Sequence, residues 1–112
     1  MKSLLLIAFA AAQLFAATPE LRVSDTDARK AAIEKRMPAY PPAAKQLRIS
    51  GKVELEAIIG TDGQVESVKI LAGNPLLTKA GADALKSWKF SPFTLEGKTV
   101  RAAAILTFDF RQ

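Results

Sequence analysis

The order of apolar and polar residues marks one strand near the middle of the chain. Between Lys52 and Ile59 every odd position is apolar, whereas positions 52, 54 and 56 are charged. A period of two is typical of a half-buried β-strand. The strand is followed by Asp62-Gly63, a pair that favours a tight turn because glycine adopts positive φ without strain. We therefore predict a β-hairpin whose second strand is Gln64–Leu71.

The second strand of this hairpin changes its phase. In an ideal strand Val65 lies on one face, and Val68 and Ile70 lie on the other. A β-bulge inserts one extra residue into an antiparallel strand and so restores a common face. We predict such a bulge near Glu66-Ser67.

The main helix is predicted directly after the hairpin. Asn74 is a favourable N-cap residue, and Pro75 suits the first helical position. The residues behind them recur at helical spacing and form one apolar stripe, made of Leu77, Ala80, Gly81, Ala84, Leu85 and Trp88. A glycine within a helix costs about 1 kcal/mol relative to alanine, and a close approach to the sheet would explain Gly81. We predict a helix over Pro75–Lys89.

The last strand is predicted over Val100–Phe110. Its even positions form an unbroken apolar face, and its odd positions point the other way: Arg101, Ala103, Ile105, Thr107 and Asp109. A right-handed crossover after the second strand places the last strand beside the first. The predicted fold is α+β, a three-stranded antiparallel sheet in the order second-first-last with the main helix packed on one face and short N-terminal helices.

The segments before the first strand carry weaker signals. Thr18–Val23 shows no clear periodicity and is interpreted as a mobile lead-in. Ser24-Asp-Thr-Asp27 resembles a capping box, so we predict a short, loosely docked helix that ends before Met37-Pro38. Pro42 can begin a second short helix that ends at Leu47 or Arg48.

The first residues are typical of a secretory signal. Met1-Lys2 precedes an apolar run from Ser3 to Ala17. This run is shorter than the roughly 20 residues that span a bilayer. Cleavage near Ala16 and export to the periplasm are therefore favoured over an uncleaved inner-membrane anchor. The predicted organisation is a signal peptide at 1–16, a lead-in with a possible short helix at 17–38 and one domain at 39–112.

Composition restricts the chemistry of the chain. The formal net charge is +5, and the chain has neither cysteine nor histidine. The missing cysteine excludes disulfides and thiolate metal sites, and the missing histidine removes the commonest general base and metal ligand. The basic residues are scattered and are not interleaved with aromatic residues that could stack on bases, so nucleic-acid binding is not expected. We predict a protein that is not an enzyme and has no cofactor and no metal.

Short motifs follow one another in order from Ala39 to Phe110. They are Tyr40-Pro-Pro-Ala-Ala-Lys-Gln-Leu-Arg-Ile-Ser-Gly51, Thr61-Asp-Gly63, Val65-x-x-Val-x-Ile70, Asn74-Pro75, Trp88-x-Phe90-x-Pro92, Gly97-Lys98 and Leu106-x-Phe108. Each motif alone is weak, but their ordered spacing closely resembles the TonB C-terminal domain family.

The resemblance implies a periplasmic domain that docks onto outer-membrane transporters in TonB-dependent transport. The implied ligand is the TonB box, a short extended transporter segment that is bound by strand addition. In the predicted sheet the last strand is an edge, and half of its backbone groups lack partners, as strand addition requires. The candidate partner-binding residues are Tyr40, Pro41, Val100, Arg101, Ala103, Ile105, Thr107 and Asp109.

The sequence also departs from the family pattern. Family members have a membrane-spanning N-terminus coupled to a proton-driven motor and a Pro-rich spacer, and neither is recognisable here. A separate inner-membrane motor is one candidate partner. The alternative is a self-associating structural or adaptor module of the envelope, such as a homodimer paired through the same edge, with no direct role in energy transduction.

Overall fold

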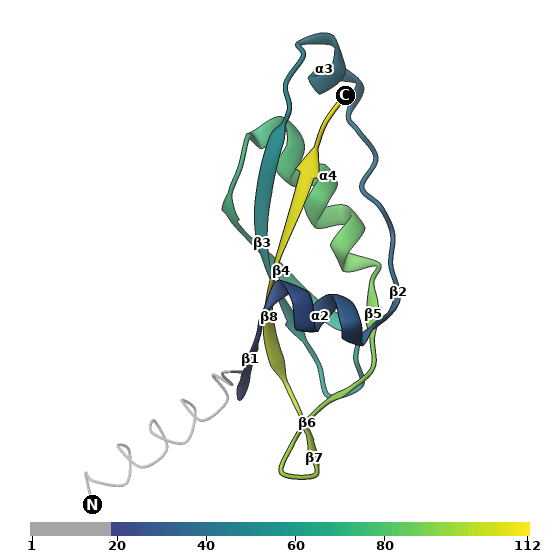
Figure 1. The fold of residues 1–112 in the computed structure, drawn as a ribbon, viewed down its shortest axis with the longest axis vertical. Helices are drawn as coiled ribbons and strands as arrows, with labels where there is room; N and C mark the ends of the chain where they lie inside the picture. The colour runs from purple at the N-terminus through teal and green to yellow at the C-terminus, as the bar shows by residue number, and fades with distance from the viewer. Residues whose placement is uncertain (1–18) are drawn as a thin grey trace, which may run out of the picture.

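The computed structural model of the protein describes residues 19–112 (Figure 1). The predicted signal peptide lies outside these residues. In chain order the elements are β1 (Leu21–Val23), α2 (Asp25–Ala31), β2 (Ala32–Glu34), α3 (Pro42–Gln46), β3 (Gly51–Ile59), β4 (Val65–Ala72), α4 (Pro75–Lys86), β5 (Lys89–Phe90), β6 (Phe93–Leu95), β7 (Lys98–Val100) and β8 (Ala102–Phe110). No helix in this part of the chain is long and apolar enough to cross a membrane.

The hairpin β3–β4 forms as predicted. Gly63 in the connecting turn has a φ of +84°. Ile58 pairs with Ser67 and Ile59 pairs with Val65, so that Glu66 is the extra residue of a bulge. This confirms the predicted bulge, and it brings Val65 and the later apolar residues of β4 opposite the core-facing residues of β3.

Helix α4 packs across β3 and β4 on one face of the sheet (Figure 1). The Asn74 side chain accepts a hydrogen bond from the Leu76 N–H at 2.8 Å and caps the helix. A Cβ added at Gly81 would lie 3.1 Å from the Val53 side chain, which confirms the predicted close approach. The helix is shorter than predicted, because it ends at Lys86 and Lys89 already lies in β5, which pairs with β2.

Strand β8 pairs antiparallel with β3 along its whole length. Its even side chains are buried as predicted, with Leu106 fully buried and Phe108 against the buried Trp88 ring. The strand starts later than predicted, because Val100 belongs to β7 and forms a hairpin with β6. The predicted neighbours second-first-last are present as β4, β3 and β8.

The prediction of a three-stranded sheet was wrong. The sheet has four strands in the order β1-β8-β3-β4, and the added strand β1 pairs parallel with β8 through Leu21, Arg22 and Val23. In the lead-in, apolar and polar residues alternate only over Leu21, Arg22 and Val23. Three residues are too few to establish a period of two. The last strand is therefore not the outermost strand along Ala102–Ala104.

Helix α2 follows β1 and lies against β8 (Figure 1). The Ser24 hydroxyl accepts a hydrogen bond from the Asp27 N–H at 3.2 Å, which is the N-cap that the sequence suggested. Ala28 is fully buried and joins the common core, so the helix is firmly docked and not loosely docked. After β2 the chain runs extended along the core, where the Arg36 carbonyl accepts a hydrogen bond from the Trp88 indole at 2.9 Å.

Candidate docking edge

The backbone of β8 has two sides with different partners. Thr107 directs its N–H and its C=O to α2 and away from β3. Because successive residues of a strand alternate in direction, the odd residues of β8 present their hydrogen-bonding groups to the outer side, and the even residues bond to β3. The outer side of β8 is the candidate docking edge.

The same alternation fixes the directions in β3 and β4. The odd residues of β3 bond to β8, and its even residues bond to β4. Ser67 and Lys69 are paired with even β3 residues, so their backbone groups face β3. The N–H groups of Val68 and Ile70 consequently point to the opposite outer edge of the sheet.

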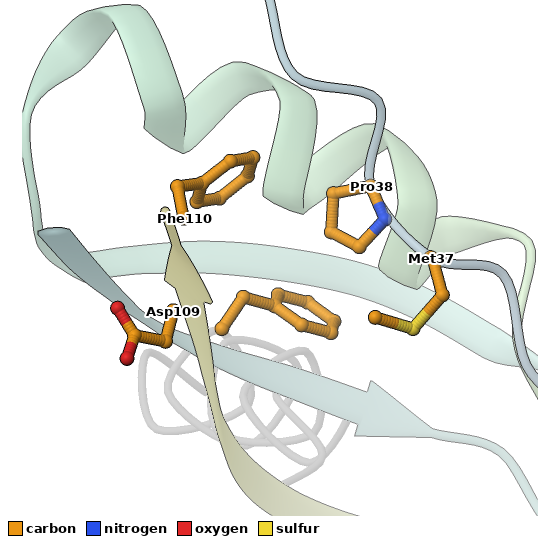
Figure 2. A pocket seen from close by; sticks show the side chains of 5 residues that line it. Met37, Pro38, Asp109 and Phe110 are labelled. Carbon is orange, nitrogen blue, oxygen red and sulfur yellow. The ribbon is translucent and has the colours of Figure 1, made fainter. Parts of the chain in front are cut away.

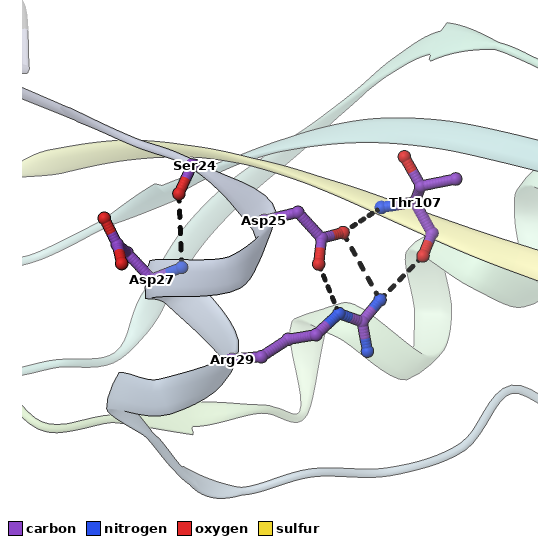
Figure 3. Close-up of polar contacts among 5 residues, drawn as sticks. All are labelled: Ser24, Asp25, Asp27, Arg29 and Thr107. Carbon is purple, nitrogen blue, oxygen red and sulfur yellow. Dashed lines mark hydrogen bonds and ion pairs between the residues drawn. The ribbon is translucent and has the colours of Figure 1, made fainter.

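The N-terminal segment already occupies much of the docking edge. The Arg101 carbonyl accepts hydrogen bonds from the Glu20 N–H at 3.0 Å and from the Leu21 N–H at 3.3 Å. Strand β1 then pairs along Ala102–Ala104. Three residues further on, the Asp25 carboxylate accepts a hydrogen bond from the Thr107 N–H at 2.8 Å (Figure 3).

Arg29 completes this contact, which we call the α2 clip and define as Asp25, Arg29 and Thr107. The Arg29 guanidinium donates to the Thr107 carbonyl at 2.6 Å and to the Asp25 carboxylate at 2.6 Å (Figure 3). Its centre also lies 5.6 Å from the Trp88 ring and 5.5 Å from the Phe108 ring. Charged hydrogen bonds and cation–π contacts of this kind are among the stronger polar interactions. The clip thus fixes α2 on β8 and on the core.

The structure places the predicted partner-binding residues of the last strand in different surroundings. Val100 is buried in the β6–β7 hairpin, and Ala103 is buried beside β1. The Arg101 side chain pairs with Glu66 at 2.7 Å. Ile105 remains 38% exposed on the open face of the sheet. Thr107 belongs to the α2 clip, and Asp109 pairs with Arg111 at 2.8 Å.

Tyr40 and Pro41 lie at the far end of β8. The Tyr40 ring meets the Phe110 ring edge-on with centroids 5.7 Å apart, and its hydroxyl donates to the Ile49 carbonyl. Pro41 is the N-cap residue of α3. Tyr40 thus contacts the C-terminal end of β8 through Phe110, nine residues after Arg101.

A small apolar notch opens between the extended segment and the end of β8. Its volume is about 50 Å³, and it is lined by Met37, Pro38, Phe108, Asp109 and Phe110. Figure 2 shows the Asp109 carboxylate turned away from Met37 and Pro38. The Met37 side chain is 81% exposed, so the notch offers an apolar contact next to the part of the edge that lies beyond the α2 clip.

The sequence did not identify β1, Asp25 or Arg29 as parts of this site. The alternation of Leu21, Arg22 and Val23 was the available signal, since Val23 is buried and Arg22 is exposed. Asp25 and Arg29 stand four residues apart, a spacing that allows a pair on one helix face. Neither signal indicates the distant strand that these residues contact.

Other surfaces offer less chemistry. An open hollow of about 460 Å³ near the C-terminus is lined by Arg48, Ser50, Arg111 and Gln112. Within residues 19–112 no group of three or more acidic, histidine or cysteine side chains could hold a metal ion. The hydrogen bond from Lys79 on the outer face of α4 lowers the pKa of Asp83 below its ordinary value.

The chain is similar in sequence to several known proteins. A family model described as Gram-negative bacterial TonB protein C-terminal matches residues 36–112. Protein TonB of Pseudomonas aeruginosa is 26% identical over 98 residues, which is 86% of this chain and 28% of that protein. Protein TonB of Escherichia coli is 32% identical over 63 residues, which is 54% of this chain and 26% of that protein.

A solved structure shows the same fold. The solution NMR structure of the Pseudomonas aeruginosa TonB C-terminal domain superimposes with a TM-score of 0.60 and 26% identity, covering 72% of this chain and 84% of that chain. Compared with the two full TonB proteins above, the chain spans only about a quarter of their length. Strands β1 and β2 and helix α2 precede residue 36, where the family match begins.

Proposed function

The chain belongs to the TonB C-terminal domain family, and from this premise we propose that it docks onto outer-membrane transporters by binding an extended segment, the TonB box, along the outer edge of β8. The proposed setting is TonB-dependent transport in the periplasm, after cleavage of a signal peptide near Ala16.

One observation carries the proposal: the outer edge of β8 already has an added strand. Strand β1 is bonded there in parallel orientation over three residues. Strand addition obtains its affinity from backbone hydrogen bonds and its selectivity from side-chain contacts. The buried even side chains of β8 belong to the core and stay in place when a strand pairs with the odd residues, although such a guest displaces β1 and its buried Val23.

Side chains near the edge can select the guest. Ile105 is available on the open face, and the notch between Met37 and Phe110 offers an apolar contact. Tyr40, whose ring contacts Phe110, and its neighbour Pro41 are proposed to border the end of the edge.

The proposal is tested by proline substitutions on the two outer edges of the sheet. Proline removes a backbone donor, and the N–H groups of Ile105 and Ile70 point to opposite outer edges. A TonB-box peptide is titrated by calorimetry into the wild-type protein, Ile105→Pro and Ile70→Pro. We expect Ile105→Pro to weaken binding at least tenfold and Ile70→Pro to change it less than twofold.

Circular dichroism accompanies each titration, so that only folded variants are compared. Equal binding by wild-type protein and folded Ile105→Pro would contradict docking at β8. Loss of binding only in Ile70→Pro would move the docking site to β4.

A second candidate function is self-association through the β4 edge, although the register shifts of β4 and the Lys69 charge weaken such pairing. Within the described residues β4 is an outermost strand, and Ile70 is 50% exposed on it. Two copies could pair there and form a structural or adaptor module of the envelope. Sedimentation velocity over a range of protein concentrations, with and without the TonB-box peptide, separates this function from transporter docking.

A further inference from the structure

We infer that the segment Leu21–Arg29 is an internal guest: it fills the docking edge of β8, competes with an external strand and must be released before a transporter segment binds there. This inference rests on the proposed function, because it concerns the regulation of the same edge. It adds a competitor from this chain and a rule for the guest that the edge prefers.

The internal guest contacts the outer edge of β8 from Arg101 to Thr107. Backbone hydrogen bonds begin at Arg101, β1 pairs through Ala104, and the α2 clip binds Thr107. An external strand on the same odd residues requires the same backbone groups. The two occupants therefore exclude each other.

The internal guest also displays the chemistry that the edge recognises. It runs parallel to β8 with apolar Leu21 and Val23 on either side of Arg22. Its carboxylate at Asp25 then takes the Thr107 N–H at 2.8 Å, two residues after the strand ends (Figure 3). We expect the edge to prefer a parallel extended segment followed at the same spacing by an acidic side chain.

The β1 part of this occupant is held by few contacts, whereas Val23 and Ala28 belong to the core, so release of the segment exposes both side chains. Strand β1 has only three residues, and the Arg22 side chain is 83% exposed in its ion pair with Glu56 at 3.9 Å. The main sheet pairing of β8 with β3 spans nine residue pairs and does not depend on β1. Competition lowers the apparent affinity for an external guest by the fraction of molecules in which the edge is open.

A reversible covalent lock tests the inference directly. Arg22 and Ala103 are register partners of β1 and β8, and neighbouring strands approach closely enough for a disulfide. Because the chain has no cysteine, the double variant Arg22→Cys/Ala103→Cys can form only one intramolecular bond. We expect the oxidised protein to bind the TonB-box peptide at least tenfold more weakly than the same protein after reduction. Equal affinity in the two states would overturn the inference.

A matched pair of acidic residues provides the opposite test. Asp25 and Asp27 both lie in the first turn of α2, but only the Asp25 carboxylate contacts β8 (Figure 3). We expect Asp25→Ala to bind the TonB-box peptide about tenfold more tightly than wild type and to exchange the Thr107 amide hydrogen faster. Asp27→Ala should stay within about twofold of wild type. Equal peptide affinities and equal Thr107 exchange in the two variants would overturn the inference.

A peptide of the chain's own residues 19–26 separates this inference from the proposed function. We expect it to bind the full-length Asp25→Ala protein and to shift the Thr107 amide resonance, and its version with Asp25→Ala to bind at least fivefold more weakly. If this peptide binds and no TonB-box peptide does, the internal guest stands and the transporter function fails. If TonB-box peptides bind but neither the lock nor Asp25→Ala changes their affinity, the function stands and the internal guest fails.

Discussion

The two outer sides of the sheet differ in how their hydrogen-bonding groups are satisfied. On the β8 side, β1 and the α2 clip bind backbone groups from Arg101 to Thr107. On the β4 side, within the described residues, no further strand is paired, and the N–H groups of Val68 and Ile70 face outward. One edge is long, regular and covered, whereas the other is open.

The open edge has its own protection. The pairing of β4 with β3 shifts register at Glu66 and at Leu71, which leaves only Ser67–Ile70 regular. Bulges and charged residues such as Lys69 make an edge a poor template for another strand. The regular edge of β8 has no bulge in its pairing with β3, so it needs a cover or a guest. The comparison indicates that the regular β8 edge is a better template for an added strand than the more exposed but irregular β4 edge.

The largest expected effect on stability comes from removing the Trp88 ring, which packs in the core and contacts Arg29 of the α2 clip. Trp88 is buried, donates to the Arg36 carbonyl and packs under Arg29. We expect Trp88→Ala to lower the free energy of unfolding by about 3–5 kcal/mol, which is close to the whole stability of a small domain. Leu76→Ala, at an exposed position of α4, is the control and should cost less than about 1 kcal/mol. Urea unfolding followed by circular dichroism measures both, and equal costs would contradict the packing.

The next effect separates the clip from an ordinary surface ion pair. Arg29 binds Asp25, the Thr107 carbonyl and two aromatic rings, whereas Arg22 in β1 only approaches Glu56. We expect Arg29→Ala to cost about 2–3 kcal/mol and Arg22→Ala less than about 0.5 kcal/mol. Urea unfolding of the two variants measures the difference. If Arg29→Ala lowered the free energy of unfolding no more than Arg22→Ala, the α2 clip would not hold the cover on the β8 edge, and the two edges would differ less than proposed.

A pair of prolines compares the outer donors of the two edges. The Thr107 N–H is bonded to the Asp25 carboxylate, and the Ile70 N–H faces outward from β4. We expect Thr107→Pro to lower the free energy of unfolding by about 2 kcal/mol, because the Asp25 carboxylate loses its backbone donor and keeps only Arg29. Ile70→Pro should cost about 1 kcal/mol or less, because proline is tolerated on the outer side of an edge strand. Thermal unfolding in the same buffer measures both, and the reverse order would show that the assigned backbone directions are wrong.

Much of the fold could be predicted from the sequence because the relevant signals are local and periodic. The strand β3, the Glu66 bulge, the start of α4 and the close approach at Gly81 follow from alternation, capping and glycine placement. The end of α4 was placed too late, because the apolar stripe continues through Trp88 after the helix has ended at Lys86.

The surroundings of the candidate docking edge were only partly predictable, for a different reason. Its odd residues follow from the alternation of β8, but its cover does not, because Asp25 and Arg29 meet Thr107 across about 80 residues of chain. A three-residue strand has too few positions to show a period. The spacing of Asp25 and Arg29 allows a pair between them but does not indicate that both contact Thr107. Long-range polar contacts of this kind require the folded chain.

The smallest expected effect on stability tests the protection of the open edge. Lys69 lies on the solvent side of β4 within its regular stretch, and we expect Lys69→Val to change the free energy of unfolding by less than about 0.5 kcal/mol. The substitution removes the charge that opposes pairing with another strand. Sedimentation velocity should therefore show concentration-dependent association of Lys69→Val and less or none of wild type, and Ile70→Pro in the same background should reverse it. If wild type and Lys69→Val associate equally, the charge does not protect β4, and the difference between the two edges lies in the bulges alone.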